Sequence, residues 1–573
     1  MCQVVGIGAS AGGLDAFTRF FQAMPADSGM AFVLIQHLDP THESLTAELL
    51  GKHTKMPVRQ VAGDVAVQAD HVYVIPPNKY MSISNGVLRL TPPVERHAMR
   101  MPIDFFFRSL AQDQQERAIG IILSGTGTDG TLGLKEIKMV GGMAIAQNPK
   151  TIQHGGMPQS AIANDAVDHV LAAEKMPGML LKYARHPYVA VAGLEPPAET
   201  DSDDLTRVLA LVRARLRFDF TGYKGTTLRR RVHRRMGLRH LERMLDYLRL
   251  LRSDEEELKA LFKDLLIGVT RFFRDPPAWQ FLEEKVLPTL VRKREADAPL
   301  RVWVAGCGTG EEAYSIGMVL IEQVQATQRR GPIQIFASDV DEQALDFARA
   351  GVYPESIAAD VSPARLSRFF LKSENSFHVS KELREAVIFA RQNLIADAPF
   401  SRLDLILCRN LLIYLEPEVQ KRVISLLHFA LAPGGLLFLG NAESIGTADD
   451  LFDTASRKWH VYRRVGPTPY DRVHMPAMAQ AERAPQRDAA PAFAPTATRL
   501  VARVQRFLLD RYAPASVVIN RRYDILFFSG PVDNYLTQPP GPILRRLAHT
   551  TKAAGLRLLP SGLRRSTQVA LRR

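Results

Sequence analysis

Three residues in the first 130 positions are of the types that a serine hydrolase needs. Ser10 lies in a G-x-S-x-G motif, and His37 and Asp129 follow it along the chain. Such an enzyme uses a hydroxyl nucleophile, an imidazole that takes its proton and returns it to the leaving alcohol, and a carboxylate that fixes the imidazole tautomer. The three residue types together predict acyl chemistry, with Ser10, His37 and Asp129 as catalytic residues.

Each of these residues follows a predicted strand. The strands are the apolar runs 4–7, 31–35 and 119–123. A helix predicted to begin near Leu14 places Ser10 on a strand–turn–helix connection, where the N–H of Ala11 would face a developing oxyanion. Because the carboxyl ends of parallel strands meet at one edge of a sheet, we expect the three side chains to lie together.

Each residue alone also has a simpler explanation. Gly6, Gly8 and Ala11 fit the G-x-G-x-x-A spacing of a nucleotide loop, although that loop needs an acid at the end of the next strand. His37 alone is typical of a surface histidine, and Asp129 alone of an Asp-Gly turn. The order serine, histidine, aspartate differs from that of the α/β-hydrolases, so a lipase-like fold is disfavoured.

A second group of residues predicts a nucleoside site. The apolar run 302–305 is followed by Gly306, Gly308 and Gly310, and a helix is predicted from about Glu311. The spacing is G-x-G-x-G rather than G-x-G-x-x-G, and acidic residues stand where a pyrophosphate needs free helix N–H groups. This favours a nucleoside ligand without phosphates.

Two further predicted strands end in polar residues. The run 333–337 leads to Asp339, whose carboxylate can accept hydrogen bonds from ribose hydroxyls, and 403–407 leads to Asn410. Helical stretches separate these strands. The pattern predicts a parallel doubly wound sheet with a crevice at its carboxyl edge.

Length and composition indicate several globular domains. The chain has 573 residues, of which 46% are hydrophobic, so two or three domains are expected. Cys2, Cys307 and Cys408 show no metal or disulfide spacing, which predicts no metal and a reducing cytoplasm. Met1 opens no signal-peptide pattern, and the apolar window 423–440 is interrupted by Pro-Gly-Gly, so no membrane insertion is expected.

The net charge of +13 is concentrated in two segments. Residues 213–243 contain eleven Lys and Arg against two acids, and residues 541–573 contain eight and none. A high pI suggests nucleic acid, but two basic segments on a nearly neutral body favour docking surfaces instead. Within the first segment, a helix around 228–236 would present its arginines either to solvent or to an acidic helical partner.

The first third of the chain resembles the catalytic domain of chemotaxis-receptor methylesterases (CheB type). The motifs GASAGG and QHLDP, the segment 100–104, the motif SGTGTDG and the segment 155–161 occur in that order, and the resemblance covers about 4–184. It implies that Ser10 is the nucleophile, His37 the acid/base and Asp129 its orienting partner. Family members commonly carry a receiver domain first. The catalytic strand here starts at residue 4, so we expect control to come from elsewhere.

The middle of the chain resembles the chemotaxis-receptor methyltransferases (CheR type) from about 219 to 464. The motifs LLIGVTRFFRD, CGTGEEAYS, FASDVD, RQNL and CRNLLIY carry the resemblance, which implies S-adenosylmethionine as cofactor. By motif match the cofactor contacts are Thr270, Arg274, Gly306, Gly308, Gly310, Glu312, Asp339, Asn393, Leu394, Asn410 and Leu411. Thr270 and Arg274 would lie one helical turn apart, and Gly268 stands where family members often have a polar residue. Tyr414 is a candidate to position the acceptor.

The C-terminal part resembles the opening of a PAS sensor domain. A linker is expected over 466–498, a helix over 501–512 and a hairpin over 515–529. The fold class is therefore α/β, with two doubly wound parallel-sheet catalytic domains, a small helical subdomain between them and a partial α+β PAS-like C-terminus. The predicted boundaries are 1–185 methylesterase, 186–204 linker, 205–285 helical subdomain, 286–465 cofactor-binding domain, 466–498 linker, 499–540 PAS-like segment and 541–573 basic tail.

The combined expectation is a bifunctional signalling enzyme. One domain would methylate glutamate side chains on chemoreceptor cytoplasmic domains, and the other would hydrolyse the resulting esters, with glutaminyl amides as a further substrate left open. Two alternatives remain at this point: a receptor-binding scaffold with one or both sites inactive, and a nucleic-acid methyltransferase suggested by charge alone.

Overall fold

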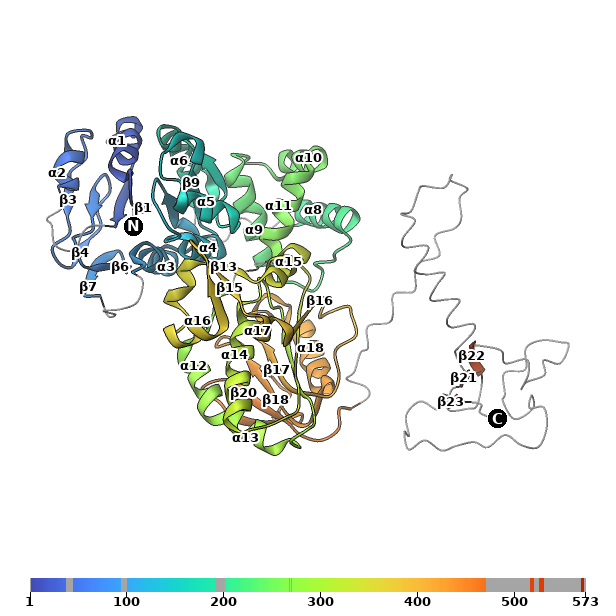
Figure 1. The fold of residues 1–573 in the computed structure, drawn as a ribbon. Coiled ribbons are helices and arrows are strands. Elements are labelled where there is room, and N and C mark those ends of the chain that lie inside the picture. The colour runs from blue at the N-terminus through green and yellow to red at the C-terminus, as the bar shows by residue number, and fades with distance from the viewer. Residues whose placement is uncertain are drawn as a thin grey trace, which may run out of the picture. The chain divides into compact units, whose positions relative to one another are not determined.

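A computed structural model describes residues 2–37, 45–93, 100–190, 201–266, 268, 270–469, 516–519, 525–529 and 568–570. The chain divides into two compact units, Met1–Ala479 and Gln480–Arg573. In the larger unit we distinguish the first lobe (residues 2–190), the helical segment (201–266) and the second lobe (268–469), which follow one another along the colour scale of Figure 1.

The first lobe is built on a seven-stranded parallel sheet. In spatial order its strands are β10 (His169–Leu171), β9 (Met143–Gln147), β8 (Ile119–Ile122), β1 (Gln3–Ala9), β2 (Met30–Gln36), β5 (Val72–Val74) and β3 (Val58–Gln60). Strand β1 lies between β2 and β8, so the three strands predicted to carry the hydrolase residues are neighbours. The sequence prediction of these strands is confirmed.

Helices cover both faces of this sheet, because alternate side chains of its strands are buried on opposite sides. Val5 belongs to one apolar cluster and Val4 to another. The helices are α1 (Gly13–Ala23), α2 (Thr46–Gly51), α3 (Pro102–Gln114), α4 (Thr131–Met139), α5 (Gly156–Ala163), α6 (Met176–Ala184) and α7 (Pro187–Ala190). An antiparallel sheet of β4 (Val65–Ala66), β7 (Val87–Thr91) and β6 (Tyr80–Ser84) was not predicted.

The helical segment consists of α8 (Asp201–Leu216), α9 (Gly225–Leu238), α10 (Met244–Ser253) and α11 (Glu255–Leu266). It has its own apolar core, which includes Val208, Val232 and Tyr247. These four helices lie within or overlap the predicted helical subdomain 205–285. The predicted linker 186–204 contains α7 and the start of α8, and residues 191–200 lie outside the described residues.

The second lobe is a second α/β unit with a seven-stranded sheet. Its order is β16 (Val387–Arg391), β12 (Ile333–Asp339), β11 (Leu300–Ala305), β17 (Leu403–Cys408), β18 (Leu431–Leu439), β20 (Val461–Arg464) and β19 (Phe452–Ser456). All neighbouring pairs are parallel except those that involve β20. The doubly wound arrangement predicted for this part is confirmed, with two antiparallel strands added at one edge.

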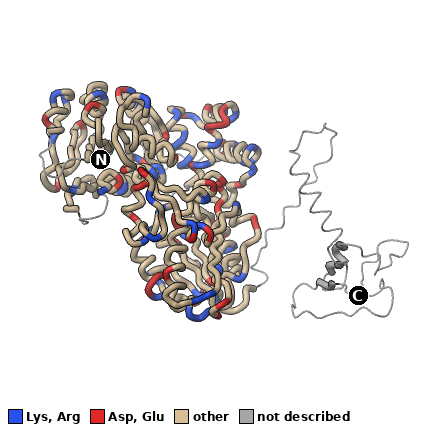
Figure 2. Tube along the Cα trace, viewed as in Figure 1, with Lys and Arg blue, Asp and Glu red and all other residues tan. Residues whose placement is uncertain are grey.

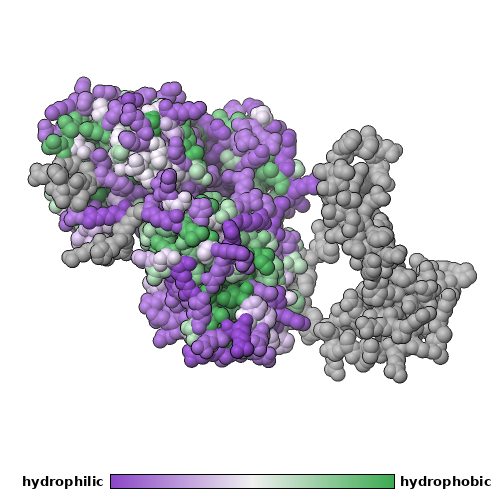
Figure 3. All heavy atoms as spheres, viewed as in Figure 1, coloured by the Kyte–Doolittle hydropathy of each residue, from purple (hydrophilic) through white to green (hydrophobic). Residues whose placement is uncertain are grey.

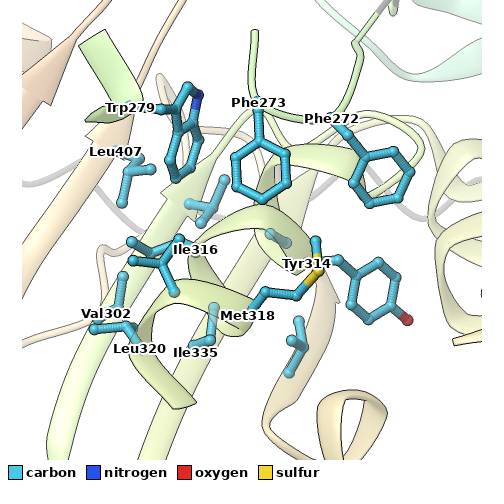
Figure 4. Packing of buried hydrophobic residues seen from close by; sticks show 14 of the residues in the cluster. Phe272, Phe273, Trp279, Val302, Tyr314, Ile316, Met318, Leu320, Ile335 and Leu407 are labelled. Atoms are coloured by element: carbon cyan, nitrogen blue, oxygen red, sulfur yellow. The ribbon is translucent and has the colours of Figure 1, made fainter. Parts of the chain in front are cut away.

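Helices α12 (Pro276–Phe281), α13 (Leu287–Lys293), α14 (Glu311–Ala326), α15 (Glu342–Ala350), α16 (Pro363–Phe369), α17 (Lys381–Glu385) and α18 (Pro417–Ala430) accompany this sheet. Helix α14 begins at Glu311, as predicted. Figure 4 shows Val302, Ile335 and Leu407 from three neighbouring strands packing with Ile316 and Met318 of α14. A small sheet of β13 (Val352–Pro354), β15 (Ser376–Val379) and β14 (Phe370–Lys372) completes the lobe.

The smaller unit contains β21 (Ser516–Ile519) and β22 (Ile525–Ser529), which pair in antiparallel fashion and confirm the strands of the predicted hairpin. Strand β23 (Gln568–Ala570), in the predicted basic tail, pairs with β21. The predicted helix 501–512, nearly all of the linker 466–498 and the rest of the PAS-like segment and tail lie outside the described residues.

The charged residues are distributed over the larger unit in both signs (Figure 2). On the face shown in Figure 3, hydrophilic residues predominate and hydrophobic residues form patches between them. Within the described part of the chain, every helix is too short or too polar to cross a membrane.

Candidate active sites

The first lobe brings Ser10, His37 and Asp129 into one hydrogen-bonded chain. Ser10 follows β1, His37 follows β2, and Asp129 lies in the loop after β8. Ser10 Oγ is 3.3 Å from His37 Nδ1, and His37 Nε2 is 2.8 Å from Asp129 Oδ2. The His37 side chain is 32% exposed and that of Asp129 only 2%. An imidazole between a hydroxyl and a buried carboxylate can move a proton to and from a serine nucleophile.

The Asp129 carboxylate is held by the N-terminus of α3. Oδ2 accepts a hydrogen bond from the N–H of Ile103, and Oδ1 accepts one from the N–H of Asp104, both at 2.9 Å. Amides of a first helical turn stabilise a negative charge. Burial, together with the neighbouring Asp129, raises the pKa of the Asp104 carboxyl well above its usual range. Asp129 is thus held by two backbone amides while its Oδ2 also contacts His37 Nε2.

The turn that carries Ser10 depends on glycine. The Ser10 N–H donates to the carbonyl of Ser124 at 2.9 Å, which ties the end of β1 to the segment after β8. Gly12 caps α1 with φ +74°, and a Cβ there would lie 2.7 Å from Ser124 Oγ. A side chain at this position would be strained by the backbone and would push Ser124 away. The tight turn therefore follows from the GASAGG motif itself.

A cavity opens beside His37 in the first lobe. It is lined by Gln36, His37, Ile75, Pro76, Asn78, Lys79, Tyr80, Pro93, Arg100 and Pro102. Lys79 and Arg100 are exposed and give this rim a positive charge. An acidic substrate segment would suit such a rim.

The second lobe has a pocket at the carboxyl edge of its sheet. The predicted cofactor residues Thr270, Arg274, Gly306, Gly308, Glu312, Asp339, Asn393, Leu394, Asn410 and Leu411 line it. Gly310 does not. It caps α14 with φ +94°, and a Cβ there would lie 2.8 Å from the Cβ of Ala348. Gly310 thus shapes the turn without forming part of the wall.

Asp339 fixes the glycine turn and also faces the pocket. At the end of β12, its carboxylate accepts hydrogen bonds from the N–H groups of Gly308 at 2.8 Å and Asp341 at 3.0 Å. Burial raises its pKa. A carboxylate has about four acceptor positions, so two backbone bonds leave capacity for hydroxyl groups of a ligand.

Glu312 and Arg409 form a buried charged wall of the pocket. The Arg409 side chain is fully buried, 2.8 Å from Asp275 and 3.7 Å from Glu312, and its guanidinium lies 4.7 Å from the centre of the Phe438 ring. Burial raises the pKa of Glu312, and Arg409 partly opposes this. Among the described residues, Glu312 Oε1 is buried without a hydrogen-bond partner. An unsatisfied buried carboxylate oxygen in a pocket wall fits a ligand that brings a positive charge or a donor.

Thr270 and Arg274 line the pocket, but the prediction that they lie on one helix is wrong. Helix α11 ends at Leu266 and α12 begins at Pro276. The connecting chain has positive φ at Phe273 and at Asp275, which a right-handed helix does not allow. Gly268, in the same connection, also lines the pocket.

Several pocket residues were missing from the predicted cofactor contacts. They are Tyr223, Leu266, Ser338, Val340, Gln392, Ile395, Arg409 and Leu415. Tyr223 belongs to the helical segment, and its backbone forms a β-bridge with Leu415. Tyr414, predicted to position the acceptor, lines the same pocket, and burial raises its pKa. The helical segment therefore closes one side of the pocket. In the sequence, only the aromatic residues within 218–223 could have indicated this role.

Glu443 holds the loop after β17 in place. Its Oε1 accepts from the N–H groups of Leu411 and Leu412 at 2.8 and 2.7 Å, and its Oε2 from those of Asn410 and Gly440 at 2.8 Å. The prediction missed this residue, because it lies 33 positions after Asn410.

Three of the arginines of α9, Arg231, Arg234 and Arg235, are buried and do not form the solvated or partner-docking face considered from the sequence. Arg234 is fully buried, 2.6 Å from Asp168 and 2.5 Å from Asp264. Arg235 pairs with Glu257, and Arg231 donates to main-chain carbonyls of α4. A buried charge needs a partner, and here the acidic partners are supplied by the same chain.

Comparisons with known proteins agree with this division. Residues 5–180 match the CheB methylesterase family, 203–266 the all-alpha domain of CheR methyltransferase, and 268–461 its SAM binding domain.

Among similar proteins, an uncharacterized 104.1 kDa protein of Rhodobacter capsulatus is 37% identical over 520 residues, covering 86% of this chain. The chain spans 54% of that relative's length. Chemotaxis protein methyltransferase 2 of Vibrio cholerae is 33% identical over 40% of this chain and 77% of its own length. The catalytic domain of Thermotoga maritima CheB methylesterase is 28% identical, covers 32% of this chain and 98% of its own, and superposes with a TM-score of 0.30.

The cofactor is S-adenosylmethionine. The family of the second lobe binds it, and the pocket described above suits its charges, because the orphaned Glu312 oxygen and Asp339 offer acceptors to a cationic nucleoside. The predicted pairing of two catalytic domains is thereby confirmed, whereas the PAS assignment stays a prediction. The chain belongs to the chemotaxis protein methyltransferase family and carries a CheB methylesterase domain fused ahead of its methyltransferase domains.

Proposed function

We propose that this chain methylates glutamate side chains of chemoreceptor cytoplasmic domains in the second lobe and hydrolyses the resulting methyl esters in the first. The observation that carries the proposal is the presence of two separate sites at two sheet edges. One is a hydrogen-bonded Ser10–His37–Asp129 chain, and the other is a cofactor pocket at Asp339.

In the first lobe, Ser10 Oγ attacks the ester carbonyl while His37 Nδ1 takes the hydroxyl proton. The proton then passes to the departing methoxide oxygen, which leaves as methanol, and an acyl-enzyme remains. Water attacks this acyl-enzyme with His37 again as base, which returns the carboxylate and the free serine. Asp129, fixed by two backbone amides, keeps the imidazole oriented and stabilises its charged form. The N–H of Ala11, at the start of the α1 turn, is the proposed oxyanion donor.

In the second lobe, S-adenosylmethionine supplies the methyl group when bound. The acceptor carboxylate has a reference pKa of about 4.3 and is ionised at neutral pH, so no residue needs to act as a general base. The chain's contribution is to place the acceptor in line and to exclude water, an effect of roughly 7–11 kcal/mol at most. Glu312 and Asp339 would hold the cationic nucleoside, and Tyr223 and Tyr414 would border the acceptor's approach.

An acidic helical segment is the proposed substrate for both sites. Lys79 and Arg100 rim the cavity beside His37, and Arg274 lines the cofactor pocket. Positive side chains of this kind speed the encounter with an acidic partner, and their effect falls with salt.

The test uses the full chain and purified cytoplasmic fragments of chemoreceptors. Fragments incubated with methyl-labelled S-adenosylmethionine are expected to gain label on glutamate, and wild-type chain but not the Ser10→Ala variant should release labelled methanol. Absence of label on the fragments would contradict the methyltransferase half. Equal methanol release by both chains would contradict the esterase half.

A further inference from the structure

A short piece of the second lobe touches the first lobe beside the catalytic aspartate. The 3-10 turn η5 (Glu355–Ala359) follows β13. Within it, the N–H of Ser356 donates to Thr128 Oγ1 at 3.0 Å, and both residues are buried. Thr128 immediately precedes Asp129. The second lobe therefore fixes Thr128, and Thr128 is the neighbour of Asp129, which orients His37.

A second contact from the second lobe reaches helix α3, which holds Asp129. Arg108 lies one turn after Asp104 in α3, the helix whose first amides hold the Asp129 carboxylate. Its two terminal nitrogens donate to the two oxygens of Asp360, each at 2.9 Å. Only 20% of the Arg108 side chain and 9% of the Asp360 side chain are exposed. Bidentate pairs of this kind fix direction as well as distance.

The turn that makes these contacts is itself firmly anchored in the second lobe. Ile357 is buried in the main apolar cluster of that lobe. Tyr353, three residues before Ser356, donates from its hydroxyl to the carbonyl of Thr309 at 2.7 Å. Ser356 and Asp360 thus project from a rigid support, which a positioning element requires.

We infer that Ser356 and Asp360 of the methyltransferase lobe are positioning residues for the esterase, because they fix the loop and the helix that together hold Asp129. The inference rests on the proposed roles of Ser10, His37 and Asp129. It makes the esterase dependent on the lobe that, in the proposed function, forms the ester. A displacement of about 1 Å in a catalytic group can cost about 100-fold in rate.

The experiment reverses the charges of the bidentate pair in the full chain. Arg108→Asp, Asp360→Arg and the double variant are compared in the hydrolysis of p-nitrophenyl acetate, a small ester that needs no receptor docking. Each single variant is expected to lose about 10- to 100-fold in kcat with KM changed less than about threefold. The double variant should recover most of the loss, because the pair is restored with its charges exchanged.

Two further variants keep the test decisive. Lys263→Ala removes an exposed ion pair between Lys263 of the helical segment and Asp165 of the first lobe. This pair is not among the contacts that hold Asp129, so the variant should leave hydrolysis unchanged. Thr128→Val removes only the acceptor of the Ser356 N–H and should lower kcat about tenfold. If the charge-reversed chains fail to fold, as judged by loss of S-adenosylhomocysteine binding, Thr128→Val decides alone.

The outcomes separate the inference from the proposed function. Wild-type hydrolysis that Ser10→Ala does not abolish would overturn both. Ser10-dependent hydrolysis that is unaffected by Thr128→Val, and by those charge-reversed variants that fold, would overturn only the positioning role. Loss in the folded single variants without recovery in the double variant would also overturn it, since a merely structural disturbance would behave in that way.

Discussion

The two sites lie at equivalent edges of two similar sheets, yet they are built in opposite ways. In the first lobe, three side chains from neighbouring strand ends touch one another, and the buried charge of Asp129 already has its hydrogen bonds. In the second, the wall residues come from strand ends, loops and the helical segment, and Glu312 keeps an unsatisfied oxygen. The difference follows from the chemistry. Ester hydrolysis needs a proton moved within the protein, whereas methyl transfer to an ionised carboxylate needs mainly a cationic ligand held in place.

The largest effect expected from this comparison is the loss of one activity alone. Ser10→Ala should lower ester hydrolysis by about 10⁶-fold, because the nucleophile is gone and only binding and oxyanion stabilisation remain. Binding of S-adenosylhomocysteine, measured by titration calorimetry, should not change. Ser84→Ala, an exposed serine of β6, is the matched control. If both serine variants behaved alike, the contrast between the sites would be lost.

The next effect concerns the contact between the helical segment and the first lobe rather than either site. Arg234→Ala should lower the free energy of unfolding by about 3–5 kcal/mol, since it removes the nearest cationic partner of the buried Asp168 and Asp264 and leaves them only Lys138 at 3.9 Å and Arg235 at 4.0 Å. Urea denaturation followed by fluorescence measures this. The control is Arg349→Ala, which removes exposed ion pairs with Glu342 and Asp346 and should cost less than about 1 kcal/mol. Equal costs for the two would show that the buried pair does not hold the helical segment to the first lobe.

A third prediction concerns the Asp339 carboxylate in the cofactor pocket. Asp339→Ala should weaken S-adenosylhomocysteine binding by about 10- to 100-fold, because the Gly308 and Asp341 amides lose their acceptor along with the ligand. Hydrolysis of a small ester should be preserved. Asp346→Ala, an exposed carboxylate on α15, serves as the control. Unchanged affinity in Asp339→Ala would remove this carboxylate from the cofactor site.

The smallest effect is a pH dependence of cofactor binding at the second site. Burial raises the pKa of Glu312, so its carboxylate gains a proton at a higher pH than an exposed glutamate does. Below that pKa the wall loses its negative charge, and affinity for the cationic cofactor should fall about two- to fivefold between pH 8 and pH 5. Glu312→Gln should bind with a flatter profile. A wild-type profile as flat as that of the variant would contradict this role.

The difference between the sites also explains what the sequence could predict. Ser10, His37 and Asp129 could be predicted because each follows a strand, and the carboxyl ends of parallel strands gather at one edge of the sheet. The backbone amides of Ile103 and Asp104, which hold Asp129, could not be predicted, because a backbone N–H has no side-chain signature in the sequence. The motif match found most of the cofactor pocket in the same way, through its glycine turn and strand ends.

Predictions failed where the partner is distant in the chain. The α9 arginines looked like a free basic face, because Asp168 lies 66 positions from Arg234 and no local pattern connects them. Arg409 was overlooked for a similar reason, as its partner Asp275 lies 134 positions away. The helix assumed through Thr270 and Arg274 was wrong because helical spacing alone does not reveal the positive φ values around Phe273 and Asp275.

The central claim is that one polypeptide adds a methyl group at the second lobe and removes it at the first, and a pulse–chase measurement tests it most directly. Receptor fragments are methylated by the chain with labelled S-adenosylmethionine, and excess unlabelled S-adenosylhomocysteine then stops further transfer. We predict that label leaves the fragments as methanol when the chain is wild type and stays on them when it carries Ser10→Ala. Label that never reaches the fragments, or that leaves them at the same rate with both chains, would contradict the account.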